Sequence, residues 1–160
     1  MNRELLDLLV RNARQSDQDL ADQLGLSAEA VAGQIAELEA AGVVRGYHAI
    51  VNEDKVEDPQ VTAVIEVQVV PEREGGFNRL ALRISRFPEA RSVYLMSGAM
   101  DLLVFVEGRD LREISSFVSE KLAPMEGVSG TRTHFLMKTY KHRGVLMDHE
   151  DEFEKLKVTP

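Results

Sequence analysis

The chain has 160 residues, of which 44% are hydrophobic and 29% are charged, and it contains no cysteine. This composition is typical of a soluble globular protein, and the absence of cysteine excludes disulfides, thiolate metal sites and cysteine nucleophiles. The formal charge of −8 argues against a protein that coats nucleic acid broadly, but a local patch can still contact DNA.

Nothing in the sequence predicts contact with a membrane. No apolar run approaches the roughly 20 residues that a membrane span needs. The opening segment Met1–Leu5 contains an acidic residue where a secretory signal is basic, and no small-residue cleavage site follows. We therefore expect a cytoplasmic protein.

The domain expected over residues 1–52 carries three runs of apolar residues at helical spacing. These runs predict helices at about residues 3–13, 17–24 and 28–41. Ser16 and Ser27 are the expected N-caps of the second and third helices, and Asp19 completes a capping box with Ser16. Gly25 and Gly42 stand where helices commonly end.

The segment Val43–Val51 is rich in β-branched residues and is expected to form a short strand or wing after the third helix. Three helices, a tight glycine turn and a β-wing are the order of a winged helix-turn-helix. A small helical bundle can also contain a glycine-capped turn, so the turn Leu24–Ser27 alone leaves that alternative open.

The segment Glu53–Gln60 is polar, contains a proline and is expected to be a linker over residues 53–60. Residues 61–143 predict a second domain with four strands and two helices. The strands are expected at Val61–Val70, Val93–Met96, Leu102–Val106 and about Ser129–Tyr140, and the helices at about 77–85 and 110–122. This β-α-β-β-α-β order is the ferredoxin-like arrangement, so the predicted fold class is α+β.

The two central strands, Val93–Met96 and Leu102–Val106, are apolar on both faces, as is much of Val61–Val70. Such strands need cover on both sides, which predicts helices on one face and a second copy of the protein on the other. In the loop between the central strands Gly98 can adopt a positive φ, and Asp101 can accept from loop amides or contact a ligand. Beyond this domain, an acidic and peripheral extension is expected over residues 144–160.

Three segments resemble the Lrp/AsnC (feast/famine) family of transcriptional regulators. Leu38–Tyr47 resembles the family's L-E-x-x-G-V-I-x-G-Y segment, Gly98–Asp101 its G-x-x-D loop, and Gly127–Thr133 its G-V-x-x-T-x-T strand. The three segments have the family's order and spacing, and the resemblance extends from about residue 3 to about residue 143. It implies a RAM-type ferredoxin-like domain behind the winged helix-turn-helix.

The resemblance implies a homodimer formed by packing of the two sheets, possibly assembled further into an octamer. It also implies that an amino acid or a related small effector binds between dimers. The expected effector-binding residues are Ser97, Gly98, Ala99, Met100, Asp101, Thr131 and Thr133. Judged alone, Asp101 can equally be a turn cap, and the two threonines can be ordinary solvent-facing strand residues.

The resemblance further implies contact with double-stranded DNA through the third helix and its flanks. The expected DNA-binding residues are Arg14, Ser27, Glu29, Ala30, Gly33, Gln34, Glu37 and Arg45. Among them Gln34 is of the type that reads adenine. The protein departs from the family because Ala28–Ala40 contains no lysine or arginine, and residues 1–50 carry a net charge of −4. DNA affinity rises with the phosphates neutralised, so this head is expected to bind weakly or to depend on multivalency.

Two other functions compete with a regulator. A sensing or protein-interaction module that has lost DNA binding is consistent with the acidic third helix. An enzyme is not expected, because the four histidines are scattered and no G-x-S-x-G nucleophile motif is present. Neither a cofactor nor a metal is expected.

Overall fold

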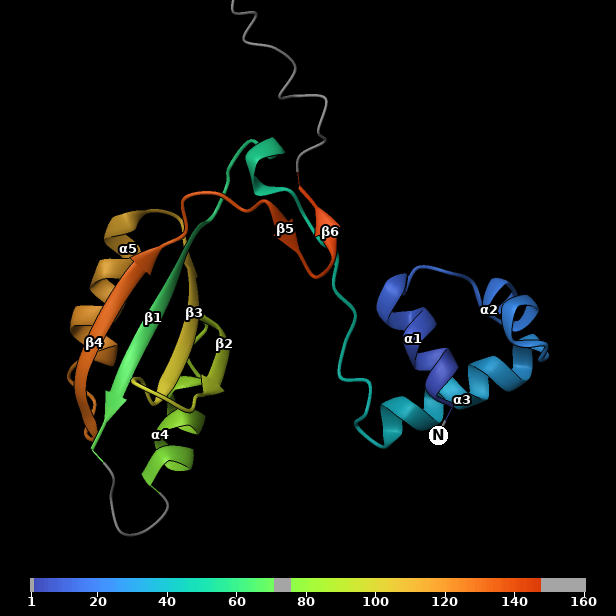
Figure 1. Ribbon diagram of the computed structural model, residues 1–160, viewed down its shortest axis with the longest axis horizontal. Coiled ribbons are helices and arrows are strands. Elements are labelled where there is room, and N and C mark those ends of the chain that lie inside the picture. The colour runs from blue at the N-terminus through green and yellow to red at the C-terminus, as the bar shows by residue number, and fades with distance from the viewer. Residues whose placement is uncertain (1, 71–75, 148–160) are drawn as a thin grey trace, which may run out of the picture. The chain divides into compact units, whose positions relative to one another are not determined.

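The computed structural model describes residues 2–70 and 76–147, which fall into two compact units that divide between Ala49 and Ile50 (Figure 1). This division is close to the boundary predicted at residue 52. Most of the acidic extension predicted over residues 144–160 lies outside the described residues. None of the described helices is long and apolar enough to cross a membrane.

The N-terminal unit contains the three predicted helices. They are α1 (Arg3–Arg11), α2 (Asp17–Leu24) and α3 (Ala28–Ala40). Their apolar sides form one core, made of Leu5, Leu9, Leu20, Ala21, Val31 and Leu38. Gly25 ends α2 with a φ of +66°, which glycine adopts without steric cost, and the backbone therefore turns directly into α3.

Capping side chains fix where α2 and α3 begin. The Ser16 hydroxyl oxygen accepts from the backbone N–H of Asp19 (3.1 Å), and the Asp19 carboxylate accepts from the backbone N–H of Ser16 (3.1 Å). These bonds form the predicted capping box, and the Ser16 hydroxyl, which donates to the Asp19 carboxylate (2.6 Å), is the main cause that lowers the pKa of Asp19. Ser27 caps α3 by accepting from the N–H of Ala30 (3.2 Å). Local sequence signals therefore set the helix-turn-helix.

The strand predicted over Val43–Val51 does not form in the isolated protomer. After Gly42, which has a φ of +68°, this segment contains no helix or strand, and Val43 and Tyr47 are exposed. A strand needs a partner for its backbone N–H and C=O groups, and no described residue pairs with this segment. Of the predicted strand or wing, only the strand is absent, because β-branched residues favour a strand only where a neighbouring strand is available.

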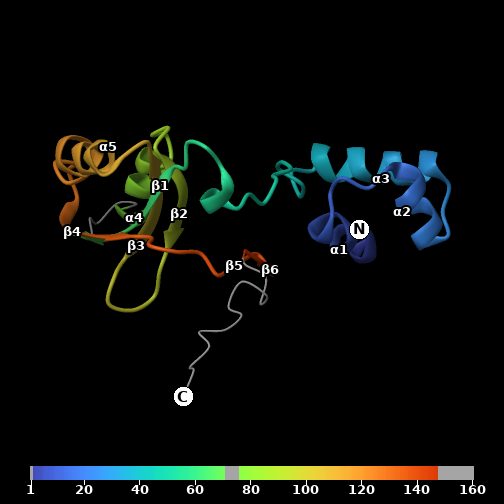
Figure 2. The same cartoon turned by 90° about the horizontal axis from the view of Figure 1, so that it is seen from above.

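The C-terminal unit has the predicted β-α-β-β-α-β fold. Its elements are β1 (Val61–Val69), α4 (Gly76–Ile84), β2 (Ala90–Leu95), β3 (Leu102–Gly108), α5 (Leu111–Ser116) and β4 (Val128–Phe135). The strands form one antiparallel sheet in the order β2-β3-β1-β4, and both helices pack on the same face (Figure 1, Figure 2). Strand β4 ends earlier than the predicted Tyr140, and a 3-10 helix, η1 (Glu53–Lys55), lies in the predicted linker.

One face of this sheet is buried under the helices, and the other is open. Ile65 of β1 and Val104 of β3 face the helices and are fully buried. On the open face β3 presents Leu103 and Phe105, and the ring of Tyr94 from β2 lies edge-on to Phe105 with the centroids 6.0 Å apart. The predicted second apolar face is therefore confirmed for β2 and β3.

Strand β1 differs from this prediction. Its open face carries Thr62, Val64, Glu66 and Gln68. The Glu66 carboxylate accepts from the Arg132 guanidinium of β4 (3.2 Å), and Nε2 of His134 lies 3.0 Å from the same carboxylate. The expectation that β1 is apolar on both faces was wrong, because its polar residues fall on alternate positions and so gather on one face.

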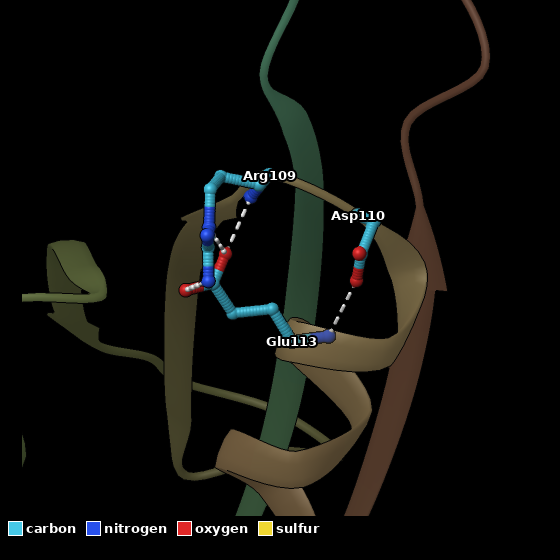
Figure 3. Close-up of polar contacts among 3 residues, drawn as sticks. All are labelled: Arg109, Asp110 and Glu113. Atoms are coloured by element: carbon cyan, nitrogen blue, oxygen red, sulfur yellow. Dashed lines mark hydrogen bonds and ion pairs between the residues drawn. The ribbon is translucent and has the colours of Figure 1, made fainter.

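Helix α5 begins at a set of polar contacts that Figure 3 shows. The Asp110 carboxylate accepts from the backbone N–H of Glu113 (2.8 Å), as expected for an N-cap. The Glu113 carboxylate reaches back and accepts from the backbone N–H of Arg109 (2.6 Å) and from its Nε (3.2 Å). The bond from the Arg109 backbone is the main cause that lowers the pKa of Glu113.

The helix then continues as a π-helical turn, η2 (Phe117–Leu122). The N–H of Ala123 donates to the C=O of Val118, five residues earlier, at 2.8 Å. This wider turn places both Phe117 and Leu122 in the core, where they are almost completely buried. The extent of the predicted helix is confirmed, but its second half has π geometry, which is often associated with functional positions.

A short hairpin follows β4 and consists of β5 (Lys141–His142) and β6 (Val145–Leu146). The turn residues Arg143 and Gly144 both have positive φ, of 45° and 89°, as the type I′ turn of a two-residue hairpin requires. The side-chain amide of Asn52, the N-cap of η1, donates to the C=O of Met147 (2.7 Å) and ties the end of the hairpin segment to the start of η1. Residues 144–147, the first part of the predicted extension, therefore take part in this hairpin and its contacts.

Candidate functional site

The exposed side of α3 carries most of the predicted DNA-binding residues. The exposed members of that set on or next to α3 are Ser27, Glu29, Ala30, Gly33 and Glu37. The side of α3 opposite to them holds the buried Val31 and Leu38. The second helix of a helix-turn-helix is the one that enters the major groove, so this exposed side is the candidate DNA face. Its charge is negative, because it carries carboxylates and no lysine or arginine.

Gln34 is half-buried beside this face. Its Oε1 accepts from Nδ2 of Asn2 (2.9 Å), which ties α3 to the N-cap of α1. A bidentate contact with adenine needs both the amide oxygen and the amide nitrogen of a glutamine. The bond to Asn2 occupies one of the two acceptor positions of Oε1 and turns the Gln34 amide toward α1.

Two predicted arginines lie outside α3. Arg14 is exposed in the turn between α1 and α2, and Arg45 is exposed after the end of α3. The Arg45 guanidinium lies over Gly42, since a Cβ on that glycine would stand 3.3 Å from an Nη atom. These two side chains are the members of the predicted set that can neutralise phosphates.

Asp101 closes the β2–β3 loop onto the end of β1. Its Oδ2 accepts from the backbone N–H of Val69 (2.8 Å), and its own N–H donates to the C=O of Val67 (3.3 Å). Its C=O accepts from the N–H of Met96 (2.8 Å), which completes the loop. Asp101 therefore supports the fold through Oδ2, and Oδ1 makes none of these bonds.

The rest of the predicted effector loop faces outward. Ser97, Gly98 and Ala99 are exposed, and Met100 is half-buried. Gly98 has a φ of +125°, which confirms the predicted positive φ, and a Cβ built there would meet no atom within 4 Å. The outer side of this loop is therefore accessible to a ligand or to another protein molecule.

The two predicted threonines lie on the other side of β1 from the loop. Thr131 pairs with Val67 and Thr133 with Ile65, so both point toward the helix-covered face, and both are half-buried. They are therefore not the solvent-facing strand residues of the simpler interpretation. The loop and Thr131 lie at the same end of the sheet, but two strand spacings, about 10 Å, separate their backbones.

A cleft in the C-terminal unit does not coincide with the expected effector residues. It has a volume of about 410 Å³. Its lining is Arg83, Arg86, Phe87, Glu120, Lys121, Pro124, Met125 and Glu126. None of the expected effector residues lines this cleft.

Sequence reasoning missed two residues that shape these sites. Asn2 caps α1 and holds Gln34, and its only sequence signal is that asparagine is a good N-cap type. Gly130 lies on β4 opposite Gln68, where a Cβ would stand 3.0 Å from the Gln68 Oε1. A glycine inside a strand pattern often marks such a close approach, so this signal was present in the sequence.

Comparison with known proteins identifies both units. The winged helix-turn-helix DNA-binding family model matches residues 2–45, and the Lrp/AsnC ligand-binding domain model matches residues 62–146. The uncharacterised HTH-type transcriptional regulator YugG of Bacillus subtilis is 39% identical over 158 residues, which span 98% of this protein and 95% of YugG.

Solved structures agree with this match over most of the chain. The crystal structure of AldR from Mycobacterium tuberculosis superposes with a TM-score of 0.73 at 28% identity and covers 88% of this protein and 92% of that one. A transcriptional regulator from Neisseria meningitidis, solved in complex with L-methionine, gives a TM-score of 0.67 at 27% identity and covers 87% and 89%. The chain therefore belongs to the Lrp/AsnC family of DNA-binding transcriptional regulators.

Proposed function

We propose that this protein regulates transcription by binding double-stranded DNA in response to an amino acid or a related small effector. The observation that carries the proposal is that a DNA-binding helix-turn-helix and an Lrp/AsnC ligand-binding domain follow one another in one polypeptide. The similar regulator from Neisseria meningitidis was solved with L-methionine, which supports an amino acid as the class of effector.

The effector site is proposed at the loop Ser97–Asp101 together with Thr131 and Thr133, completed by another copy of the protein. Small ligands bind in concave sites that enclose most of their surface, and the exposed side of the loop Ser97–Ala99 is open in one protomer. A second copy is supported by the open apolar side of β2 and β3, and the proposed unit is a homodimer that can assemble into an octamer. Residues 61–143 would form this oligomerising domain, joined by a linker, 53–60, to a DNA-binding domain, 1–52.

Regulation follows from a shift between assembly states. An effector that binds better to one arrangement of the copies increases the population of that arrangement. The spacing of the DNA-binding heads then changes, and this couples effector affinity to DNA affinity in both directions. Such a protein needs neither a catalytic residue nor a cofactor, and it acts where the DNA is, which we expect to be the cytoplasm.

A second candidate is a sensing or protein-interaction module whose helix-turn-helix binds DNA weakly or not at all. The net charge of −4 over residues 1–50 favours this candidate, because each phosphate contact that is lost weakens binding. It shares the effector site with the first candidate, so only a DNA measurement separates the two.

Mobility shift with duplexes from the upstream region of the protein's own gene, at low and at physiological salt, tests the DNA-binding half. Calorimetric titration of the full-length protein with each of the common amino acids tests the effector half. We expect a retarded complex whose affinity changes with the amino acid that the protein binds. Effector binding without a retarded complex at low salt would favour the second candidate.

A further inference from the structure

The DNA face of α3 has an unusual chemistry. Its exposed residues are Glu29, Ala30, Gly33, Ala36, Glu37 and Ala40. Glutamate side chains accept hydrogen bonds, alanine offers only a methyl group, and glycine offers none, so this face contains no side chain that donates a hydrogen bond.

Two groups that can donate, the Ser27 hydroxyl and the Gln34 amide, lie at the margins of this face and not on it. The Ser27 hydroxyl accepts from the N–H of Ala30 as the cap of α3, so its position is fixed at the very start of the helix. The Gln34 amide is held by Asn2 on the side of the helix that faces α1. The predicted DNA-contacting arginines lie outside α3, where they suit phosphates rather than base edges.

This distribution decides which base edges α3 can read. In the major groove guanine presents two acceptors, which require donors such as arginine or lysine. Cytosine and adenine present amino groups, which a carboxylate can accept from, and thymine presents a methyl group, which an alanine can contact. An acceptor-and-methyl face therefore matches amino groups and thymine methyl groups, and it does not match guanine.

Gly33 gives independent support for a close approach of the helix to DNA. A Cβ built at Gly33 would meet no atom within 4 Å, and its φ is not in the left-handed region. Neither packing nor backbone geometry therefore requires glycine here, and glycine inside a helix is less stable than alanine. A glycine is useful at this position where another molecule comes close to the backbone.

We propose that α3 reads its operator through thymine methyl groups at Ala30 and Gly33 and through a base amino group at Glu29, with no hydrogen bonds to guanine. The proposal rests on the proposed function, because it assumes that α3 enters the major groove. Glu29 and Glu37 repel phosphates, so they also weaken non-specific binding. The favourable contacts of α3 are then those with base edges in the major groove. The operator positions that α3 covers should therefore be rich in thymine, and α3 should make no hydrogen bonds to guanine there.

The test uses the full-length protein and an operator selected from random duplexes at low salt. Replacing a contacted thymine by uracil removes only its methyl group and should weaken binding about fourfold for each contact. Replacing guanine by 7-deazaguanine removes the N7 acceptor and should leave the affinity unchanged. The reverse pattern, with a loss on 7-deazaguanine and none on uracil, would overturn the inference.

Two protein variants test the same face. Gly33→Ala should maintain or raise the melting temperature, because its Cβ enters open space, yet it should weaken operator binding by about tenfold through displacement of the helix. Ala30→Ser should also weaken the operator complex, whereas Ala32→Ser, about 200° around the helix at another exposed alanine, is the matched control. Wild-type operator affinity in both Gly33→Ala and Ala30→Ser would contradict the proposal.

The tests also separate this inference from the proposed function. A protein that binds duplexes but is indifferent to uracil and to both variants is still a DNA-binding regulator, and only the reading mode fails. A protein that binds no duplex even at low salt overturns the proposed function and the reading mode with it.

Discussion

Asp101 contributes to the fold before any ligand is considered. Its Oδ2 accepts from the Val69 N–H at the end of β1, and the residue is half-buried. Removal of this acceptor would leave a partly buried N–H without a partner, which typically costs about 1–3 kcal/mol. An alanine substitution therefore mixes a structural loss with any loss of ligand binding.

The pair Asp101→Asn and Asp101→Ala separates these two effects. The asparagine keeps an amide oxygen for the Val69 N–H, so its melting temperature should stay close to that of the wild type, whereas the alanine should lower it. If Asp101 binds the ammonium group of an effector, calorimetry should show weakened binding in both variants, since both remove the negative charge. Wild-type effector affinity in Asp101→Asn would mean that Asp101 is a turn cap only.

At the scale of elements, the features that the sequence predicted well are those fixed by neighbouring residues. The start of α2 follows from the Ser16–Asp19 capping box, and the turn into α3 follows from Gly25, so both could be located without tertiary information. The strand expected over Val43–Val51 failed because strand formation depends on a partner that the isolated protomer does not supply.

In the candidate sites, too, features set by neighbouring residues were predictable, and features set by residues distant in the sequence were not. The positive φ of Gly98 was predictable from its loop, but the bond of Gln34 to Asn2 joins residues that are 32 positions apart and depends on how α1 packs on α3. The hairpin β5–β6 was missed because its strands have two residues each, although the glycine at position 144 was a usable turn signal.

The π-helical turn η2 is joined to the start of β2 by an ion pair. Lys121 donates to the Glu89 carboxylate, which stands just before β2, and the Lys121 ammonium also lies 5.9 Å from the ring centroid of Phe87. The hydrogen bond from Lys121 is the main cause that lowers the pKa of Glu89, and burial opposes it. This contact links the helix layer to the sheet at one end of the C-terminal unit.

The ion pair predicts how stability depends on pH. A carboxyl group whose pKa is lowered by folding stabilises the native state above its ordinary value of 4.5, and this contribution is lost as the pH falls through the lowered pKa. Thermal unfolding of Glu89→Gln should therefore show lower stability at neutral pH and a weaker decline on acidification than the wild type. The control Glu126→Gln alters an exposed carboxylate and should reproduce the wild-type profile. A wild-type acid decline in Glu89→Gln would contradict the assignment.

The negative charge on the exposed side of α3 should weaken the binding of DNA, and a substitution can test this. Glu37 is exposed in its C-terminal half, and Glu37→Arg replaces a repulsive carboxylate by a group that can bind phosphate. Non-specific binding should tighten, and the slope of log K against log salt should steepen by about 0.9 for one added phosphate contact. A titration of fluorescent duplex over a range of salt concentrations measures both quantities. An unchanged slope would mean that this half of α3 does not approach the DNA backbone.

At the scale of the whole molecule, assembly and DNA binding depend on each other. The protein has a formal charge of −8, and its DNA-binding head has −4, so one head gains little from phosphate contacts. Two heads joined in one assembly bind as a pair, and the second contact then benefits from a high effective concentration. DNA binding at physiological salt should therefore require the oligomer, which makes the open face of the sheet important for function as well as for stability.

The open face gives the final prediction, which concerns oligomeric state. Leu103 lies on that face opposite Glu66, and a lysine there keeps a favourable partner within the protomer while it places a charge in any interface between copies. Light scattering at micromolar concentration should show an oligomer for the wild type and a folded monomer for Leu103→Lys, together with weaker DNA binding at physiological salt. Val10→Lys, at a side chain that is 84% exposed on α1, should retain the oligomer. A wild-type protein that is a stable monomer would show that the apolar side of β2 and β3 is not covered by a second copy.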